Sequence, residues 1–141
     1  MANKKVVKGI SWKKYLQLIN TLARKIKRHI KKENIKLDGI VGVSRGGLII
    51  AVILSHKLNL PMLDEVYLSN KLLFPLIVDD ICDTGKTIQE YDESMSSGQD
   101  YLVATLHYKE EAEAEPNIYV EKIYANVNVW IKYPYEIKVN G

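Results

Sequence analysis

The chain has 141 residues, of which 47% are hydrophobic and 26% are charged, and its formal net charge is +3. This balance is typical of one soluble globular domain spanning residues 1–141, and the longest apolar run, 48–54, is too short to cross a bilayer. The single cysteine, Cys82, excludes an internal disulfide framework, and no apolar signal region follows the basic N-terminus, so we expect a cytoplasmic protein.

The first predicted element is an amphipathic helix. Apolar residues recur every three or four positions from Trp12 to Ile30, behind Ser11 as the N-cap residue. Lysines and arginines gather in its C-terminal half, where cations suit the helix dipole. A basic first third of a chain could also contact nucleic acid. We interpret it as a solvated helix face, so nucleic acid is not among the expected partners.

The following segments alternate between strands and helices. Residues 39–43 are a predicted buried strand, 44–47 a turn, and 48–58 a helix that ends before Asn59 and Pro61. Beyond these, strands are predicted at 62–68, 76–79, 101–108 and 118–125, a helix at 86–95, and short strands or extended segments at 127–131 and 135–139. The alternation predicts an α/β fold with three layers and a mainly parallel sheet, which binds ligands beyond the carboxyl ends of its strands.

One strand of this sheet ends in a cluster of acids. The apolar run before Asp79 and Asp80 is followed by a third acid, Asp83, and then by Thr84-Gly85-Lys86-Thr87 at the start of a helix. The N-terminus of a helix is a ready site for a phosphate group. Carboxylates beside such a site suit a sugar phosphate together with a metal ion.

Two other interpretations of this segment are weaker. The Gly-Lys-Thr triplet resembles the end of a nucleoside triphosphate loop, but that loop needs glycine at position 80, where an aspartate would repel the triphosphate. The acids could also serve only to cap the helix. One carboxylate is enough for a cap, and crowding two more beside it costs free energy unless cations or hydroxyl groups bind them.

A second loop is expected at the same edge of the sheet. Ser44-Arg45-Gly46-Gly47 follows the strand at 39–43, and in a parallel sheet its position matches that of the acid cluster. Paired glycines let backbone amides approach an anion, and Arg45 adds positive charge. Taken alone, a Gly-Gly pair before a helix is more often only a turn.

These residues resemble a known family. Residues 77–87 resemble the phosphoribosyl diphosphate signature of type I phosphoribosyltransferases, and 44–47 resemble the pyrophosphate loop of that family. Within the family, Trp12, the Val43–Leu48 turn and the Trp130-Ile131 pair are most similar to bacterial xanthine-guanine enzymes. The resemblance extends over about residues 12–136 and implies the type I fold, with a small hood built from the N- and C-terminal segments.

The resemblance also implies roles for the site residues. Asp79 and Asp80 would hold the ribose 2- and 3-hydroxyl groups, directly or through Mg²⁺, and Asp83 would lie near N7 of a purine and manage a proton there. The 5-phosphate would be held by Thr84, Gly85, Lys86 and Thr87, and the pyrophosphate would face Ser44, Arg45, Gly46 and Gly47. Lys109 would donate to the purine 6-oxo group, Trp130 would stack on the ring, and the backbone of Ile131 would contact it.

The implied activity is purine salvage. Ribose 5-phosphate would pass from phosphoribosyl diphosphate to N9 of a 6-oxopurine, with xanthine or guanine favoured and hypoxanthine as a further candidate, and pyrophosphate would leave. This chemistry depends on orientation and charge stabilisation and needs no covalent nucleophile, so Cys82 is interpreted as a packing residue. Related enzymes are oligomers, which implies a homo-oligomer. The alternative is a non-catalytic regulator that senses phosphoribosyl diphosphate or a nucleotide and uses its basic face on nucleic acid.

Two departures from the family affect these expectations. Catalytic members carry a long mobile loop where this chain has only residues 69–75. Three explanations stay open: the loop is deleted and the site is weaker or completed by a partner, the chain is a non-catalytic binder, or residues of a mobile loop are missing from the printed sequence. The second departure is Lys132, where the bacterial enzyme has an acid. A cation there would favour the 2-oxo group of xanthine over the 2-amino group of guanine.

Overall fold

The computed structural model describes residues 4–43, 45–68, 70–95 and 97–136. In chain order the elements are β1 (Val6–Gly9), α1 (Trp12–Lys32), β2 (Gly39–Gly42), α2 (Gly46–Leu58), the short 3₁₀ helix η1 (Glu65–Tyr67), β3 (Pro75–Cys82), α3 (Lys86–Ser94), β4 (Leu102–Lys109), β5 (Ile118–Ile123) and β6 (Val129–Lys132). The main sheet has the order β2-β3-β4-β5, and its neighbouring strands are all parallel. The terminal segments β1 and β6 pair as a separate parallel sheet, in the place expected for the hood.

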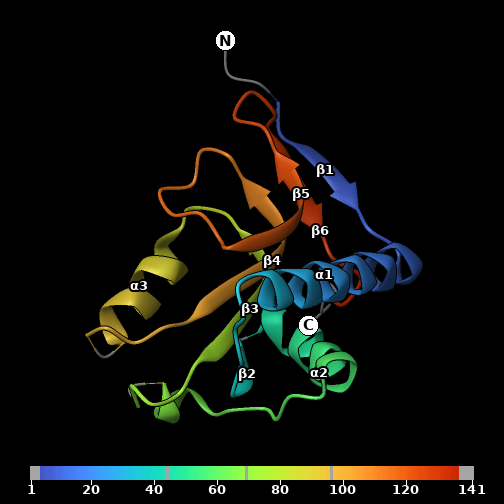
Figure 1. Cartoon of the computed structure of the whole chain (residues 1–141). Helices are drawn as coiled ribbons and strands as arrows, with labels where there is room; N and C mark the ends of the chain where they lie inside the picture. Colours follow the sequence, from blue (N-terminus) through green and yellow to red (C-terminus); the bar gives the residue numbers. More distant parts are fainter. Residues whose placement is uncertain (1–3, 44, 69, 96, 137–141) are drawn as a thin grey trace, which may run out of the picture.

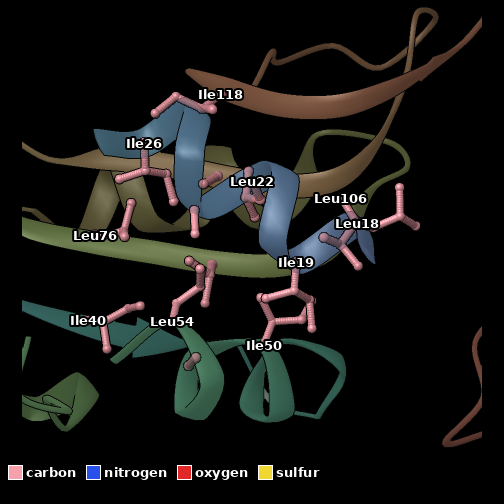
Figure 2. Close-up of a cluster of buried hydrophobic side chains, with 14 of the residues drawn as sticks. Leu18, Ile19, Leu22, Ile26, Ile40, Ile50, Leu54, Leu76, Leu106 and Ile118 are labelled. Carbon is pink, nitrogen blue, oxygen red and sulfur yellow. The ribbon is translucent and has the colours of Figure 1, made fainter. Parts of the chain in front are cut away.

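The molecule has the three layers that the sequence predicts (Figure 1). Helices α1 and α2 pack on one face of the main sheet, and their apolar side chains meet those of the strands in one core (Figure 2). A smaller cluster on the other face joins Val41, Ile77 and Val103 to Ile88 and Tyr91 of α3. Among the described helices, none is long and apolar enough to cross a membrane.

Helix α1 forms as its sequence pattern predicts. The Ser11 side chain accepts a hydrogen bond from the Lys14 amide at 3.1 Å, which caps the first turn. Its buried stripe is Tyr15, Leu18, Ile19, Leu22, Ala23 and Ile26. Cationic side chains occupy the last turn, where the helix dipole favours them.

Three predicted strands need correction. Residues 62–68 are not a strand, because Asp64 accepts the Val66 amide at 3.1 Å and starts η1, which leaves only one bridge between Ile40 and Met62. Residues 135 and 136 lie outside β6 and form no strand, and 137–139 lie outside the described residues. The strand predicted at 76–79 is longer, since β3 runs through both acids to Cys82.

The register of the sheet brings the ends of β3 and β4 together. Asp79 pairs with Thr105, and Cys82 pairs with Tyr108. The loops that follow these strands therefore leave the sheet at one edge, which is where a doubly wound sheet binds its ligands.

The connection before β3 is a compact turn in its described part. The Leu72 and Leu73 amides donate to the side chain and the main-chain oxygen of Asn70, both at 3.0 Å. The Gln99 side chain then bonds the main-chain oxygens of Asn70 and Leu73. Residues 70–74 are thus held in a compact turn by these hydrogen bonds.

Candidate active site

The loop after β2 packs directly against the strand that carries the acids. The Val43 amide donates to the main-chain oxygen of Val78 at 2.9 Å. A Cβ atom on Gly47 would overlap that same oxygen, and one on Gly46 would overlap the Asp80 carboxylate. Glycine is therefore required at position 47, where a side chain would meet fixed backbone, and at position 46 it lets the Asp80 carboxylate lie against the loop.

The pyrophosphate loop is described only in part. Ser44 lies outside the described residues. Arg45 is exposed and stands at the N-cap of α2, where its side chain makes no capping hydrogen bond. In the first α2 turn, the Gly47 and Leu48 amides donate to the main-chain oxygens of Val43 and Arg45, at 2.8 and 3.1 Å. The exposed Arg45 side chain is therefore the group of this turn that is suited to an anion. Gly46 and Gly47 begin the helix two residues earlier than predicted.

The two adjacent acids are half-buried at the carboxyl end of β3. Oδ1 of Asp79 accepts the amide of Asp80 at 2.8 Å, and Oδ1 of Asp80 accepts the amide of Ile81 at 2.7 Å. Burial first, and then the charge of Asp80, raise the pKa of Asp79 well above its usual range. A bound cation would relieve this repulsion, so the pair is suited to a metal ion.

The third acid forms an ion pair with the lysine expected to bind a base. Asp83 Oδ1 lies 2.8 Å from Lys109 Nζ, which joins the loop after β3 to the end of β4. The Lys109 side chain is only 17% exposed, whereas that of Asp83 is 48% exposed. The pair places a hydrogen-bond acceptor and a hydrogen-bond donor side by side at the edge of the site.

The predicted phosphate loop is held by the segment after β4. Gly85 has φ +86 and lies so close to Ala114 that a Cβ atom would overlap the Ala114 amide. The Glu113 amide donates to the main-chain oxygen of Thr84 at 2.9 Å, and Thr84 Oγ1 accepts the Lys86 amide at 3.2 Å. The loop is therefore shaped before any ligand binds, which is the arrangement that favours binding of an anion.

A cavity opens beside this loop. It is bordered by the predicted residues Asp79, Asp83, Thr84, Gly85, Lys86 and Thr87. Its inner wall is formed by Val43, Ile77, Tyr91, Val103 and Thr105, which the sequence analysis did not assign to the site. An acidic rim and a helix N-terminus thus face one hollow.

Cys82 behaves as the packing residue that the sequence predicts. Its thiol is buried and donates to the main-chain oxygen of Ala114 at 3.2 Å. Burial, and then the charge of Asp79, raise the pKa of this thiol to about 11. It is therefore a neutral thiol near neutral pH and a poor nucleophile.

The predicted base-binding pair lies on the hood. Trp130 pairs with Val7 through β6 and β1, its side chain is 44% exposed, and Lys5 Nζ lies 4.3 Å from the centre of its ring. Ile131 is buried in the main core, and Lys132 is exposed. The fold brings together the acids, the phosphate loop, Gly46 and Lys109. The described contact of the Trp130 ring is instead with Lys5.

Two tyrosines contact Asp80 from a segment that no motif in the sequence links to it. The Tyr135 hydroxyl donates to Oδ2 of Asp80, and the Tyr133 hydroxyl lies 3.1 Å from its main-chain oxygen. Tyr133 also lies 2.7 Å from Nδ1 of His107, which is buried. The only signal in the sequence was the Tyr-Pro-Tyr segment at 133–135, which Lys132 separates from the predicted base-binding pair.

Mg²⁺ is the cofactor expected from the sequence. Within the described part of the chain, no group of three His, Cys, Asp or Glu side chains is arranged to hold a metal ion. Mg²⁺ commonly binds one or two carboxylates together with substrate phosphates and water. Asp79 and Asp80 provide such a pair, so the residues fit the ion.

Comparison with known proteins agrees with this architecture. The chain matches no protein-family model and no curated protein. Among solved structures, it resembles a purine phosphoribosyltransferase from Pyrococcus horikoshii, with a TM-score of 0.74, 29% identity, and coverage of 96% of this chain and 98% of that chain. It also resembles a xanthine-guanine-hypoxanthine phosphoribosyltransferase from Helicobacter pylori, with a TM-score of 0.75, 17% identity, and coverage of 93% and 94%.

A third neighbour is of a different kind. A hypothetical protein from Neisseria gonorrhoeae with bound ppGpp matches with a TM-score of 0.68, 21% identity, and coverage of 96% of this chain and 92% of that chain. Together these matches confirm the type I phosphoribosyltransferase fold predicted from the sequence. The first two neighbours are pentosyltransferases, which is the enzyme class that the sequence predicts.

Proposed function

We propose that this protein is a purine phosphoribosyltransferase that transfers ribose 5-phosphate from phosphoribosyl diphosphate to N9 of a 6-oxopurine. The observation that carries the proposal is the meeting of three loops at one edge of the sheet. Gly46 touches Asp80, Asp83 pairs with Lys109, and the loop around Gly85 borders the cavity. The neighbour that is 29% identical supports the same class of reaction.

The ribose 5-phosphate half of the substrate fits the loop after β3. The phosphate would bind the amides and hydroxyls of Thr84–Thr87 at the start of α3, where the N-cap residue Gly85 has no side chain of its own and the phosphate would replace Thr84 Oγ1 as the partner of the Lys86 amide. Asp79 and Asp80 would hold the ribose hydroxyls. Mg²⁺ bound to this pair would supply charge stabilisation for the leaving pyrophosphate.

The pyrophosphate would face the start of α2. Arg45 is exposed there, and Gly46 at the start of α2 lies beside the Asp80 carboxylate. Charge that develops on the leaving group would be stabilised by the Arg45 guanidinium, and electrostatic stabilisation of this kind is usually the largest contribution that an enzyme makes to such a reaction.

The purine would bind where Asp83 and Lys109 now pair. Lys109 would donate to the 6-oxo group, and Asp83 would accept the proton at N7 as N9 attacks. Each charged group is satisfied by the other before binding, so the purine must replace an existing ion pair with equally good hydrogen bonds. A base without the 6-oxo group would leave Lys109 unpaired, which favours 6-oxopurines. Trp130 and Ile131 would complete the base site. The Trp130 ring would then lose its contact with the Lys5 ammonium group and stack on the purine.

A turnover assay tests the proposal. The protein would be mixed with phosphoribosyl diphosphate, Mg²⁺ and, in turn, xanthine, guanine, hypoxanthine, adenine and orotate. Nucleotide formed from a 6-oxopurine, with one pyrophosphate for each nucleotide, is the expected result. Product formed only from orotate or adenine would contradict the substrate class, and no product from any base would contradict the activity.

Lys132 tests the finer likeness to the xanthine-guanine enzymes. It is exposed on β6, directly after the predicted base-binding pair. If its ammonium group favours a 2-oxo purine, Lys132→Glu lowers kcat/KM for xanthine relative to guanine. An unchanged ratio would mean that Lys132 has no part in the choice of purine.

A regulatory function is the second candidate, and two observations favour it. Residues 70–74 form a compact turn where catalytic relatives are expected to carry a mobile loop, and one structural neighbour was solved with bound ppGpp. A regulator would bind phosphoribosyl diphosphate or a nucleotide tightly without releasing pyrophosphate. The same assay, combined with a binding measurement, separates the two functions.

A further inference from the structure

Asp80 is the most constrained of the three acids, and the constraint comes from outside its own loop. Oδ1 accepts the Ile81 amide, and Oδ2 lies against Gly46. The remaining contact of Oδ2 is the hydroxyl of Tyr135, which lies beyond β6. The carboxylate therefore joins the strand that carries it, the predicted pyrophosphate loop and the segment after the predicted base-binding pair.

Tyr135 is itself held in one position. Its ring stacks on that of Tyr133, with ring centres 5.7 Å apart and planes within 2° of parallel. Tyr15 of α1 packs edge-on against the same ring at 5.7 Å. Two aromatic contacts of this kind leave the Tyr135 ring little freedom to move away from the acid.

The three tyrosines differ in what their hydroxyls reach. The Tyr133 hydroxyl lies near the main-chain oxygen of Asp80 and near His107. The buried Tyr15 hydroxyl has no hydrogen-bond partner among the described residues. Tyr135 is thus the member of this cluster whose hydroxyl bonds the carboxylate itself.

The bond has a defined direction. The hydroxyl of Tyr135 is the donor and Oδ2 of Asp80 is the acceptor, because a phenol carries a proton to donate and a carboxylate oxygen accepts. Hydrogen bonds from a neutral donor to a charged acceptor are among the stronger ones that side chains make.

We propose that Tyr135 is a positioning residue, whose hydroxyl fixes the Asp80 carboxylate beside Gly46 in the orientation that receives the ribose hydroxyls. This inference rests on the proposed function for its kinetic consequence. Each carboxylate oxygen has two lone pairs, so Asp80 can still accept from a ribose hydroxyl while Tyr135 holds it. Without Tyr135, Asp80 can rotate, and part of the affinity for phosphoribosyl diphosphate is lost in restoring its orientation.

Tyr135→Phe tests the proposal because it removes the hydroxyl and keeps the stacked ring. We expect the KM for phosphoribosyl diphosphate to rise about tenfold, the range for loss of one hydrogen bond to a charged group, with a much smaller change in the KM for the purine. The matched control is Tyr101→Phe, because Tyr101 also bonds a carboxylate, that of Asp92 on α3. An unchanged KM for phosphoribosyl diphosphate overturns the proposal. A lower KM overturns it too, since Tyr135 would then occupy the place of the ribose.

Crystal structures of the wild type and of Tyr135→Phe form the second arm. The proposal expects the Asp80 carboxylate to remain beside Gly46 in the wild type and to turn away in the variant. If the carboxylate keeps its place without the hydroxyl, the proposal fails whatever the kinetics show. If the wild type has no transferase activity, the proposed function fails, and this arm still decides whether Tyr135 positions Asp80.

Discussion

At the scale of single residues, the site is governed by how each carboxylate is compensated. Asp83 forms an ion pair with Lys109 at 2.8 Å. Asp80 accepts hydrogen bonds from the Ile81 amide and the Tyr135 hydroxyl and lies against Gly46. Asp79 accepts only a neighbouring amide in the described contacts, and its charge is disfavoured by burial and by Asp80. The three acids that look alike in the sequence are therefore suited to different tasks.

Asp83→Asn separates chemistry from binding. The amide can still hydrogen-bond but cannot take a proton, so kcat should fall by about a hundredfold or more, while the affinity for phosphoribosyl diphosphate changes little. Steady-state kinetics and a direct binding measurement give the two quantities. Equal losses in both would show that Asp83 only binds.

Asp79 makes stability depend on pH in a predictable direction. Because its pKa is raised by folding, the native state holds a proton that the unfolded chain has released above about pH 4. The contribution of Asp79 is thus most favourable at low pH and is lost as the pH rises toward the raised pKa. Asp79→Asn should therefore become more stable relative to the wild type as the pH is raised.

Urea unfolding of both proteins at about pH 5 and about pH 8 measures this difference. Burial also lowers the pKa of His107, which changes stability in the opposite direction below its usual pKa. Because His107 is present in both proteins, its contribution cancels in the comparison. A difference in unfolding free energy that stays constant with pH would contradict the assigned environment of Asp79.

At the scale of elements, the loops were predictable and some pairings were not. The acid cluster and the Gly-Gly turn carry local signals, because residue type and spacing determine what such loops can bind, whereas Lys109 was assigned through the family resemblance alone. The four-residue strand β1 carries none, since all of its side chains are exposed and its partner β6 is distant in the sequence. The contact of Tyr135 with Asp80 depends on where the chain returns after β6, which no local pattern encodes.

The segment at 62–68 is the opposite case, in which the local sequence predicts a strand that does not form. Most of its residues are apolar, which suggests a strand, but a single side-chain cap at Asp64 favours a 3₁₀ turn. The local bond is available to a short segment at once, whereas a strand needs a continuous partner. Only Met62 finds one, opposite Ile40.

Gly85→Ala tests the phosphate loop as an element. Alanine disfavours the φ of +86 and would also collide with Ala114, so the loop should shift and lose stability by about 1–3 kcal/mol. Affinity for phosphoribosyl diphosphate should fall with it. Gly98→Ala is the matched control, because Gly98 has φ +79 but no atom within 4 Å of the added Cβ.

Gly98→Ala measures the stability lost by placing alanine at a positive φ. Any further loss in Gly85→Ala comes from the contact of the added Cβ with Ala114. Thermal unfolding gives the stability of both variants, and calorimetric titration gives their affinity. If both variants lose the same stability and keep full affinity, the packing of Ala114 on Gly85 does not shape the phosphate site.

At the scale of the whole molecule, α2 offers a reason to expect a second copy of the chain. The helix has no charged residue from Gly46 to Ser55, and its Leu48 and Val52 side chains are 41% and 49% exposed. An apolar strip of this kind on a helix that is also buried on its other side favours association. We propose that the homo-oligomer expected from the family resemblance forms along this strip.

Val52→Asp should therefore reduce the molar mass measured by light scattering toward the 16.1 kDa of one chain. Val66→Asp is the control, because Val66 is 70% exposed on η1. A wild type that is already monomeric, or an equal effect of both substitutions, would contradict an interface on α2.

The central claim is that the edge formed by the loops after β2, β3 and β4 holds phosphoribosyl diphosphate. Calorimetric titration of the wild-type protein with phosphoribosyl diphosphate in the presence of Mg²⁺ tests it most directly, with ATP as the competing ligand. We expect saturable binding of one phosphoribosyl diphosphate per chain and much weaker binding of ATP, because Asp80 stands where a triphosphate loop needs glycine. No binding of phosphoribosyl diphosphate, or equal binding of ATP, would contradict it.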